Sequence, residues 1–246
     1  MPLSANTLFH FTKDRESLLS ILKTKFYPRA CFEPSVIPDI LRMRMAIPMV
    51  CFCDIPLSQI SEHAKKYGNY GIGLKKEWAI EQGVTPVLYV HKNSLIPRTI
   101  ATEIKGLRPA KAADFTDEQM KHLMDLIRPV MMMKPYEIYS NELKQIVRYY
   151  DEREWRYIPP SDYPNGPDFL FESMVKDNQL DIFNKSKEKY GVEFNPDVIN
   201  YILVDKEEEI LPFKRNVVNI KGNFAYDSVE LLTTRILSMD RIKQDM

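Results

Sequence analysis

The apolar run at residues 47–53 constrains the fold most, because it is rich in strand-forming residues and is ended by Asp54 and Pro56. A run of this length bounded by turn residues predicts a buried strand. Residues 57–67 then show the spacing of a helix, and we expect Ser58 to cap it. A strand followed by a helix is therefore a unit from which this chain is built.

The same alternation recurs along the chain. Residues 8–12 predict a strand, and a helix capped by Asp14 follows over residues 15–25. Further strands are expected at 70–74, 86–90 and 200–204, with helices at 75–83 and 227–245. We predict one α+β domain over residues 1–246, with a mixed central sheet, flanking helices and a helical insertion at about 114–149.

Charge and hydropathy exclude several classes of protein. Lys+Arg and Asp+Glu both total 34, so the overall charge gives no electrostatic argument for nucleic-acid binding. No apolar run approaches the roughly 20 residues that a membrane span needs. The N-terminal residues lack the pattern of a secretion signal. We therefore expect a cytoplasmic protein without a membrane partner.

Cysteine and histidine patterns predict no metal site. Cys51 and Cys53 lie one residue apart in an apolar run, which favours buried, reduced thiols over a disulfide framework. His63, His91 and His122 lack acid or Cys partners at ligand spacing, so we expect structural roles for them. Walker A, dinucleotide-binding and nucleophile-elbow patterns are absent from the sequence, which argues against kinases, dehydrogenases and serine hydrolases.

Two carboxylates enter an aromatic run at residues 149–159. Glu152 and Glu154 are two positions apart, and on an extended backbone they would share one face. Such a pair can polarise a sugar hydroxyl or stabilise a cationic transition state. The alternative is a solvated strand edge with salt bridges to Arg153 and Arg156.

Several motifs together resemble the AbiGi-type abortive phage resistance family, whose members are described as antitoxins. These are Phe-His-Phe-Thr at 9–12, Tyr-Pro-Arg-Ala-Cys at 27–31, and the blocks at 48–56 and 67–74. The similarity continues through residues 154–156 and 233–236, and so covers nearly the whole chain. The resemblance implies a role in phage defence, and one form of that role is a non-catalytic antitoxin that neutralises a partner toxin.

A more distant resemblance is to DarT-like ADP-ribosyltransferases, which use NAD to modify nucleic acids. It is carried by a strand with His-aromatic-Thr, an arginine after the first helix and a glutamate that opens a late strand. The resemblance implies an ADP-ribosyltransferase-like fold, NAD as co-substrate and no metal. It also implies catalytic roles for Glu154, Arg29 and His10, with His10 and Thr12 holding the nicotinamide and its ribose.

The chemistry of that reaction fits these residue types. Cleavage of the nicotinamide glycosidic bond develops oxocarbenium character, which a buried carboxylate stabilises. Nicotinamide needs an aromatic surface, which Phe11, Tyr67 and Tyr70 could supply, and the pyrophosphate needs a guanidinium fork. Glu152 and Arg156 are expected on the side of the acceptor substrate.

Each assignment also has a purely structural alternative. His10 could be a hydrogen-bonded core histidine, Thr12 a helix cap, and Arg29 a surface partner of Glu33. Two hypotheses therefore remain. The first is an NAD-dependent ADP-ribosyltransferase that acts on nucleic acid and is regulated by an antitoxin or chaperone, and the second is the non-catalytic antitoxin. A metal-dependent nuclease is disfavoured because acids and histidines do not cluster at a consistent spacing.

Overall fold

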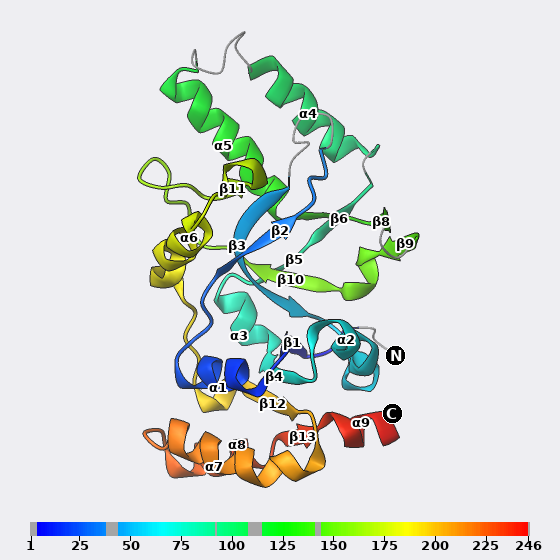
Figure 1. Ribbon diagram of the computed structural model, residues 1–246, viewed down its shortest axis with the longest axis vertical. Coiled ribbons are helices and arrows are strands. Elements are labelled where there is room, and N and C mark those ends of the chain that lie inside the picture. The colour runs from blue at the N-terminus through cyan, green and yellow to red at the C-terminus, as the bar shows by residue number, and fades with distance from the viewer. Residues whose placement is uncertain (1–3, 38–43, 92, 108–114, 141–143, 246) are drawn as a thin grey trace.

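The computed structural model describes residues 4–37, 44–91, 93–107, 115–140 and 144–245. Figure 1 shows the arrangement of its elements. The α-helices in this part are α1 (Arg15–Lys23), α2 (Ile60–Tyr67), α3 (Lys76–Glu81), α4 (Leu95–Leu107), α5 (Asp117–Met131), α6 (Gln179–Lys187), α7 (Ile210–Lys221), α8 (Tyr226–Thr233) and α9 (Met239–Asp245). The strands are β1 (Thr7–Thr12), β2 (Arg29–Glu33), β3 (Met45–Cys53), β4 (Tyr70–Lys75), β5 (Thr85–Pro86), β6 (Leu88–Val90), β7 (Met133–Pro135), β8 (Glu137–Ser140), β9 (Gln145–Arg148), β10 (Glu154–Tyr157), β11 (Leu170–Phe171), β12 (Ile199–Val204) and β13 (Ile236–Ser238).

A nine-stranded mixed sheet forms the centre of the fold (Figure 1). Its strands follow the order β13-β12-β4-β1-β3-β10-β5, while β2 and β11 also pair with β3. β12 and β13 run parallel, and β1 pairs antiparallel with both of its neighbours. The α+β class with a mixed central sheet and flanking helices is therefore confirmed.

Helices cover both faces of this sheet. Successive residues of a strand point to opposite faces, and β1 places Leu8 in one core cluster and Phe9 in another. The Leu8 cluster includes side chains from α1, α3, α7 and α8. The Phe9 cluster includes Ile60 of α2 and Met239 of α9. The sheet is thus buried on both sides, which explains the apolar character of its inner strands.

A further core lies between α4, α5 and the first half of β3, in the upper part of Figure 1. Ile104 of α4 and Ile127 of α5 pack there with Met45 and Ile47 of β3. The same strand ends at Cys53, which belongs to the cluster under α2. β3 therefore contributes residues to cores at both of its ends.

The helical insertion expected at about 114–149 is only partly helical. α5 ends at Met131, and the chain continues as β7 and the antiparallel pair of β8 and β9. Ile146 and Val147 lie in β9, which pairs with β8, so strand pairing overrides the helical spacing of these apolar residues. α4, which the sequence pattern did not indicate, adds a helix before α5. Residues 108–114 and 141–143, including Leu143, lie outside the described part of the chain.

Two helix boundaries also differ from expectation. Asp14 caps α1 as predicted, because its carboxylate accepts a hydrogen bond from the Ser17 N–H at 2.8 Å. Ser58 does not cap α2, since it lies in a 3-10 turn, Leu57–Gln59, that precedes the helix. The single closing helix predicted at 227–245 is interrupted by β13, which pairs with β12.

The glycines of β4 make room for aromatic rings from β1. A Cβ atom at Gly73 would lie 2.7 Å from the Phe9 ring, and one at Gly71 would lie 3.2 Å from the Phe11 ring. Both glycines pair with these residues across the ladder. The space left by these glycines is therefore filled by side chains of the protein itself.

Candidate functional site

A gap between β1 and β3 creates the site. The two strands pair at Phe9 and Cys53, and beyond that point β1 keeps its ladder with β4 while it separates from β3. The imidazole of His10 bridges the gap, with Nδ1 lying 2.7 Å from the Cys51 carbonyl oxygen. A carbonyl can only accept, so Nδ1 carries the proton and Nε2 is left as an acceptor.

A cavity of about 290 Å³, here called the central cavity, occupies this gap. Its walls come from β1, β2, β3, α2, β7 and the segment that leads into β10. The lining includes His10, Phe11, His63, Tyr67, Glu152 and Glu154. The central cavity thus combines aromatic surface with two carboxylates.

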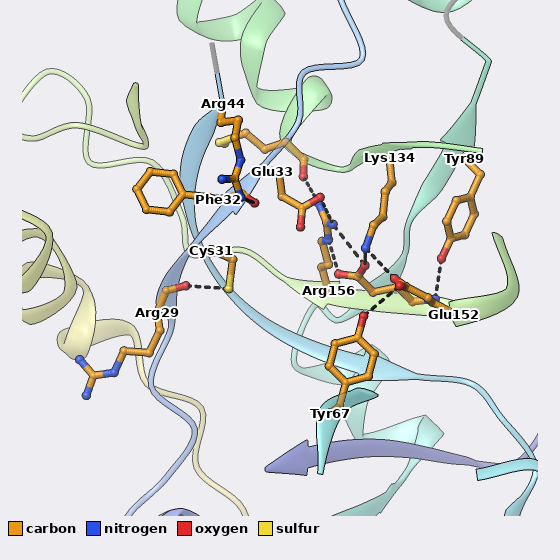
Figure 2. Close-up of polar contacts among 12 residues, drawn as sticks. Arg29, Cys31, Phe32, Glu33, Arg44, Tyr67, Tyr89, Lys134, Glu152 and Arg156 are labelled. Atoms are coloured by element: carbon orange, nitrogen blue, oxygen red, sulfur yellow. Dashed lines mark hydrogen bonds and ion pairs between the residues drawn. The ribbon is translucent and has the colours of Figure 1, made fainter. Parts of the chain in front are cut away.

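Glu152 and Glu154 converge on one lysine. Lys134 Nζ lies 2.7 Å from an oxygen of each carboxylate, and Figure 2 shows its side chain pointing toward Glu152. The extended backbone expected at both acids is present only from Glu154 onward. Glu152 ends a 3-10 helix (Tyr149–Glu152), and Arg153 then adopts a left-handed conformation with φ of 44°. A turn, rather than the pleat of a strand, therefore brings the two acids together.

Arg156 lies behind Glu154 and is fully buried. Its Nε lies 2.5 Å from Glu154 Oε1, and its Nη2 lies 3.0 Å from Glu33 Oε2. It also donates to the Met131 carbonyl oxygen at 3.0 Å. Arg156 was expected to bind the acceptor substrate. In the structure it holds the carboxylate of Glu154 in place.

This network keeps Glu154 ionised. Burial opposes ionisation, but the charges and hydrogen bonds of Arg156 and Lys134 outweigh it and lower the pKa of Glu154 to about 2. Glu152 is also buried, and its pKa is lowered by Lys134 and Lys66 against the same opposing effect. Both acids are therefore anionic at neutral pH.

Aromatic residues also line the central cavity, and one of them contacts Glu152. The Tyr67 hydroxyl donates to Glu152 Oε1 at 2.9 Å, and Lys66 forms an ion pair with the same oxygen (Figure 2 shows the Tyr67 contact). His63 lies between Tyr67 and Phe11, with ring centroids 4.5 and 5.3 Å away. Phe11 and Tyr67 thus lie in the cavity where a stacking surface was expected.

Tyr70 lies elsewhere. Its hydroxyl donates to Glu209 Oε1 at 2.9 Å, and neither residue lines the central cavity. The site therefore has two of the three aromatic residues predicted to stack on a ligand.

A second cavity, the α1 cavity, adjoins the first and measures about 410 Å³. Both cavities are lined by His10, Cys31 and Cys51. Thr12 and Arg29 line the α1 cavity only. The structure thus places His10 between the predicted catalytic glutamate and the two other predicted residues.

Arg29 is not in contact with the acid cluster. Its guanidinium forms an ion pair with Glu188 at 3.1 Å, its side chain is 52% exposed, and Figure 2 shows it turned away from the carboxylates. The alternative pairing with Glu33 is not made, because Glu33 pairs with Arg156. Arg29 could therefore reach only a ligand that extends into the α1 cavity.

Two side chains at the centre of the site were not singled out from the sequence. Lys134 is separated from Glu154 by 20 positions, and only the pairing of β7 with β6 brings it to the cluster. His63 was expected to be structural, yet it lines the central cavity. Burial lowers the pKa of His63 to about 4, so its imidazole is neutral at pH 7 and is a weak base.

His63 predicts a specific loss of stability in acid. The unfolded chain takes up this proton near pH 6.5 and the folded protein near pH 4. Stability is therefore complete above pH 6.5 and falls as the pH drops from 6.5 to 4. Between pH 7 and pH 4.5 the free energy of unfolding should therefore fall by roughly 2 kcal/mol less in His63→Gln than in the wild type, a figure that allows for the partial exposure of the ring. Urea unfolding of both proteins at pH 7 and pH 4.5 measures this difference. An equal fall in the two proteins would contradict the prediction.

Cys31, Cys51 and Cys53 are free, as the sequence suggested. Among the residues whose positions are described, His, Cys, Asp and Glu side chains form no group of three that could hold a metal ion. Within the same residues, no helix has the length and apolar character needed to cross a bilayer.

The fold and site define an α+β protein with a buried carboxylate cleft between diverging strands. Residues 24–205 match the family model described as "Putative abortive phage resistance protein AbiGi, antitoxin". The chain is also 30% identical over 221 residues to the abortive phage resistance protein AbiGi of Lactococcus lactis subsp. cremoris. The alignment covers 81% of this chain and 88% of that protein. The chain therefore belongs to the AbiGi family of abortive phage resistance proteins. No solved structure matches it.

Proposed function

We propose that this protein is an ADP-ribosyltransferase-like enzyme that transfers ADP-ribose from NAD to a nucleic acid during phage defence. One observation carries the proposal: Glu154, held anionic by Arg156 and Lys134, lines a cavity that shares the lining residues His10, Cys31 and Cys51 with a second one. A two-part ligand with a reacting centre near a carboxylate fits that arrangement.

The two cavities suggest how NAD would bind. The nicotinamide and its ribose would occupy the central cavity, with the ring against Tyr67 and Phe11. The phosphates and adenosine would extend past His10 into the α1 cavity, where Thr12 and Arg29 supply a hydroxyl and a guanidinium. To bind a phosphate there, the Arg29 guanidinium would have to break its ion pair with Glu188.

The residues account for each part of the reaction. The bond between ribose C1′ and the nicotinamide nitrogen breaks, and its electron pair leaves with neutral nicotinamide. The positive charge left on the ribose is stabilised by the Glu154 carboxylate. The acceptor atom then bonds to C1′ and passes its proton to solvent through the neutral imidazole of His63, which burial makes a weak base.

Binding and transfer can be tested separately. Calorimetry with NAD is expected to show saturable binding to the purified chain. Incubation with NAD labelled in its adenylate phosphate should then transfer label to DNA or RNA, but not to bovine serum albumin. Absence of both NAD binding and label transfer would rule out the enzyme.

A second candidate is a non-catalytic antitoxin that binds and neutralises a toxin, and the description of the matched family favours it. Expression in cells separates the two functions. If the chain alone arrests growth and Glu154→Gln relieves the arrest, the enzyme is supported, and an antitoxin or chaperone would then hold it inactive. If the chain is harmless and rescues cells from a toxin encoded beside it, the antitoxin is supported.

A further inference from the structure

A short parallel ladder, formed by β6 and β7, holds Glu154 from outside the central sheet. Tyr89 of β6 and Lys134 of β7 lie opposite each other in this ladder. The Tyr89 hydroxyl accepts a hydrogen bond from the Glu154 N–H at 2.8 Å, and the Val87 N–H donates to the Glu154 carbonyl oxygen at 3.0 Å. Lys134 Nζ contacts the Glu154 carboxylate, and Figure 2 shows Tyr89 and Lys134 extending toward Glu152. The ladder and the residue before it therefore fix both the backbone and the side chain of Glu154.

The helices α4 and α5 determine where this ladder lies. Parallel strands need a long connection, and the chain between β6 and β7 includes both helices. The ladder is tied to the end of α5, because the Leu88 N–H donates to the Met132 carbonyl oxygen at 2.9 Å. The Met131 carbonyl oxygen, at the last residue of α5, accepts a hydrogen bond from Arg156 at 3.0 Å. The helical part of the chain, at the top of Figure 1, is therefore the support on which the acids are held.

Lys134 contacts both acids rather than one. Its Nζ lies 2.7 Å from Glu152 Oε2 and 2.7 Å from Glu154 Oε2, and its side chain is only 7% exposed. Two carboxylates this close repel each other once the shared cation is removed, and such a pair takes up a proton at a higher pH. An ammonium group also opposes a positive charge that develops in the cavity. The contribution of Lys134 to transfer would therefore be to hold the two acids in place and ionised.

Other ionisable groups also face the two acids. Lys66 of α2 pairs with Glu152. Arg156 of β10 pairs with Glu154 and with Glu33 of β2. The remaining groups are the thiols of β2 and β3, the imidazole of His63 and the phenols of Tyr67, Tyr89 and Tyr149. Because the pKa of His63 is about 4, its charge stays unchanged in measurements above pH 5.

We infer that Tyr89 and Lys134 are positioning residues for the transfer reaction, a role that rests on the proposed function. Tyr89 acts through the backbone of Glu154, and Lys134 acts through the carboxylates of both acids. The Tyr89 side chain is not part of the lining of the central cavity, so it has no contact with a ligand there. Substitution of Tyr89 is therefore expected to lower kcat and to leave NAD binding unchanged.

Initial rates of label transfer from NAD to a nucleic acid, measured between pH 8 and pH 5, test both roles. Tyr89→Phe keeps the ring but leaves a buried N–H without its acceptor, so kcat should fall roughly tenfold while calorimetry gives the wild-type Kd for NAD. Lys134→Met keeps the aliphatic stem and removes the charge. Its kcat should fall roughly tenfold at pH 8 and further toward pH 5, as the acid pair takes up a proton. Lys134→Arg restores a cation and should recover part of the rate.

A second measurement needs no transfer activity. The ¹³C NMR shifts of the glutamate side-chain carboxyl carbons report ionisation directly, with Glu152→Gln and Glu154→Gln used to assign the signals. In the wild type both carboxylates should stay ionised from pH 8 to pH 5, because their pKa values are lowered. In Lys134→Met at least one of the two signals should titrate within that range.

Matched controls lie outside the site. Lys65→Met removes an ammonium group from a side chain that is 66% exposed, one residue before Lys66. Tyr226→Phe removes the hydroxyl of a residue that is 76% exposed, on α8. Both control variants should transfer label at the wild-type rate and leave the carboxyl signals unchanged.

The outcomes separate the two proposals. If the wild type transfers label and Tyr89→Phe and Lys134→Met transfer it equally fast or faster, the positioning roles are wrong and the proposed function stands. Carboxyl signals that do not titrate in Lys134→Met would also overturn the role of Lys134. If the wild type neither binds NAD nor transfers label, the proposed function fails and the positioning roles fail with it. Should Lys134→Met not fold, Tyr89→Phe and Lys134→Arg decide, since wild-type rates in Tyr89→Phe would be contrary to the inference.

Discussion

Glu154→Gln is expected to slow ADP-ribosyl transfer by roughly a hundredfold or more, the scale of losing one preorganised stabilising group. The amide keeps the size of the side chain but removes the negative charge that faces the developing oxocarbenium ion. Initial rates of label transfer from NAD to a nucleic acid measure the effect. Because Glu154 also holds Arg156 and Lys134, the rates must be taken well below the melting temperature of the variant.

Glu152→Gln provides the matched comparison. Glu152 is held by the Tyr67 hydroxyl and Lys66 and does not contact Arg156, so we expect its loss to slow transfer less. Glu172→Gln, on an exposed ion pair, should leave the rate unchanged. Full transfer by Glu154→Gln with loss of transfer in Glu152→Gln would move the catalytic role to Glu152.

Arg156→Met is expected to destabilise the protein by about 3–5 kcal/mol, which corresponds to a fall in melting temperature of roughly 6–20 °C. The substitution removes the guanidinium that pairs with both the buried carboxylate of Glu154 and the carboxylate of Glu33, whose side chain is 15% exposed. Urea denaturation at pH 7 gives the difference in the free energy of unfolding.

The pH dependence identifies the cause of that loss. The wild-type pKa of Glu154 is about 2, so this group contributes stability above pH 4.5 that is lost as the pH falls toward 2. In Arg156→Met the carboxylates should protonate at higher pH, and the difference from wild type should shrink at pH 4. Arg44→Met, at an exposed pair, should cost no more than about 1 kcal/mol. Equal losses in the two variants would show that the buried network contributes nothing.

The sequence predicted the strands and helices that have strong local patterns. β1, β3, β4 and β12 are regular apolar runs, and the Asp14 cap of α1 is a local signal, so each was found where expected. β2 was missed because its residues are only partly buried, and its pairing with the edge of β3 is set by tertiary contacts. Local propensity carries little information about such pairing.

The candidate site was predictable only in part. The sequence suggested His10, Thr12, Glu152 and Glu154 from motifs and resemblance, and the structure places His10 and both acids at one cavity. Lys134 could not be found, because its role depends on strand pairing far along the chain. The buried position of Arg156 was likewise hidden, since strand alternation alone cannot tell which face of a short strand will be covered.

The position of β3 has a consequence for how the molecule unfolds. Its first half packs under α4 and α5, and its second half borders the gap that His10 bridges. Because one continuous strand serves both regions, neither can lose its structure without removing a wall of the other. Amide hydrogens throughout β3 should thus exchange at a single slow rate, set by global unfolding. A ligand lodged between β1 and β3 would slow that exchange at Met45 as much as at Cys53.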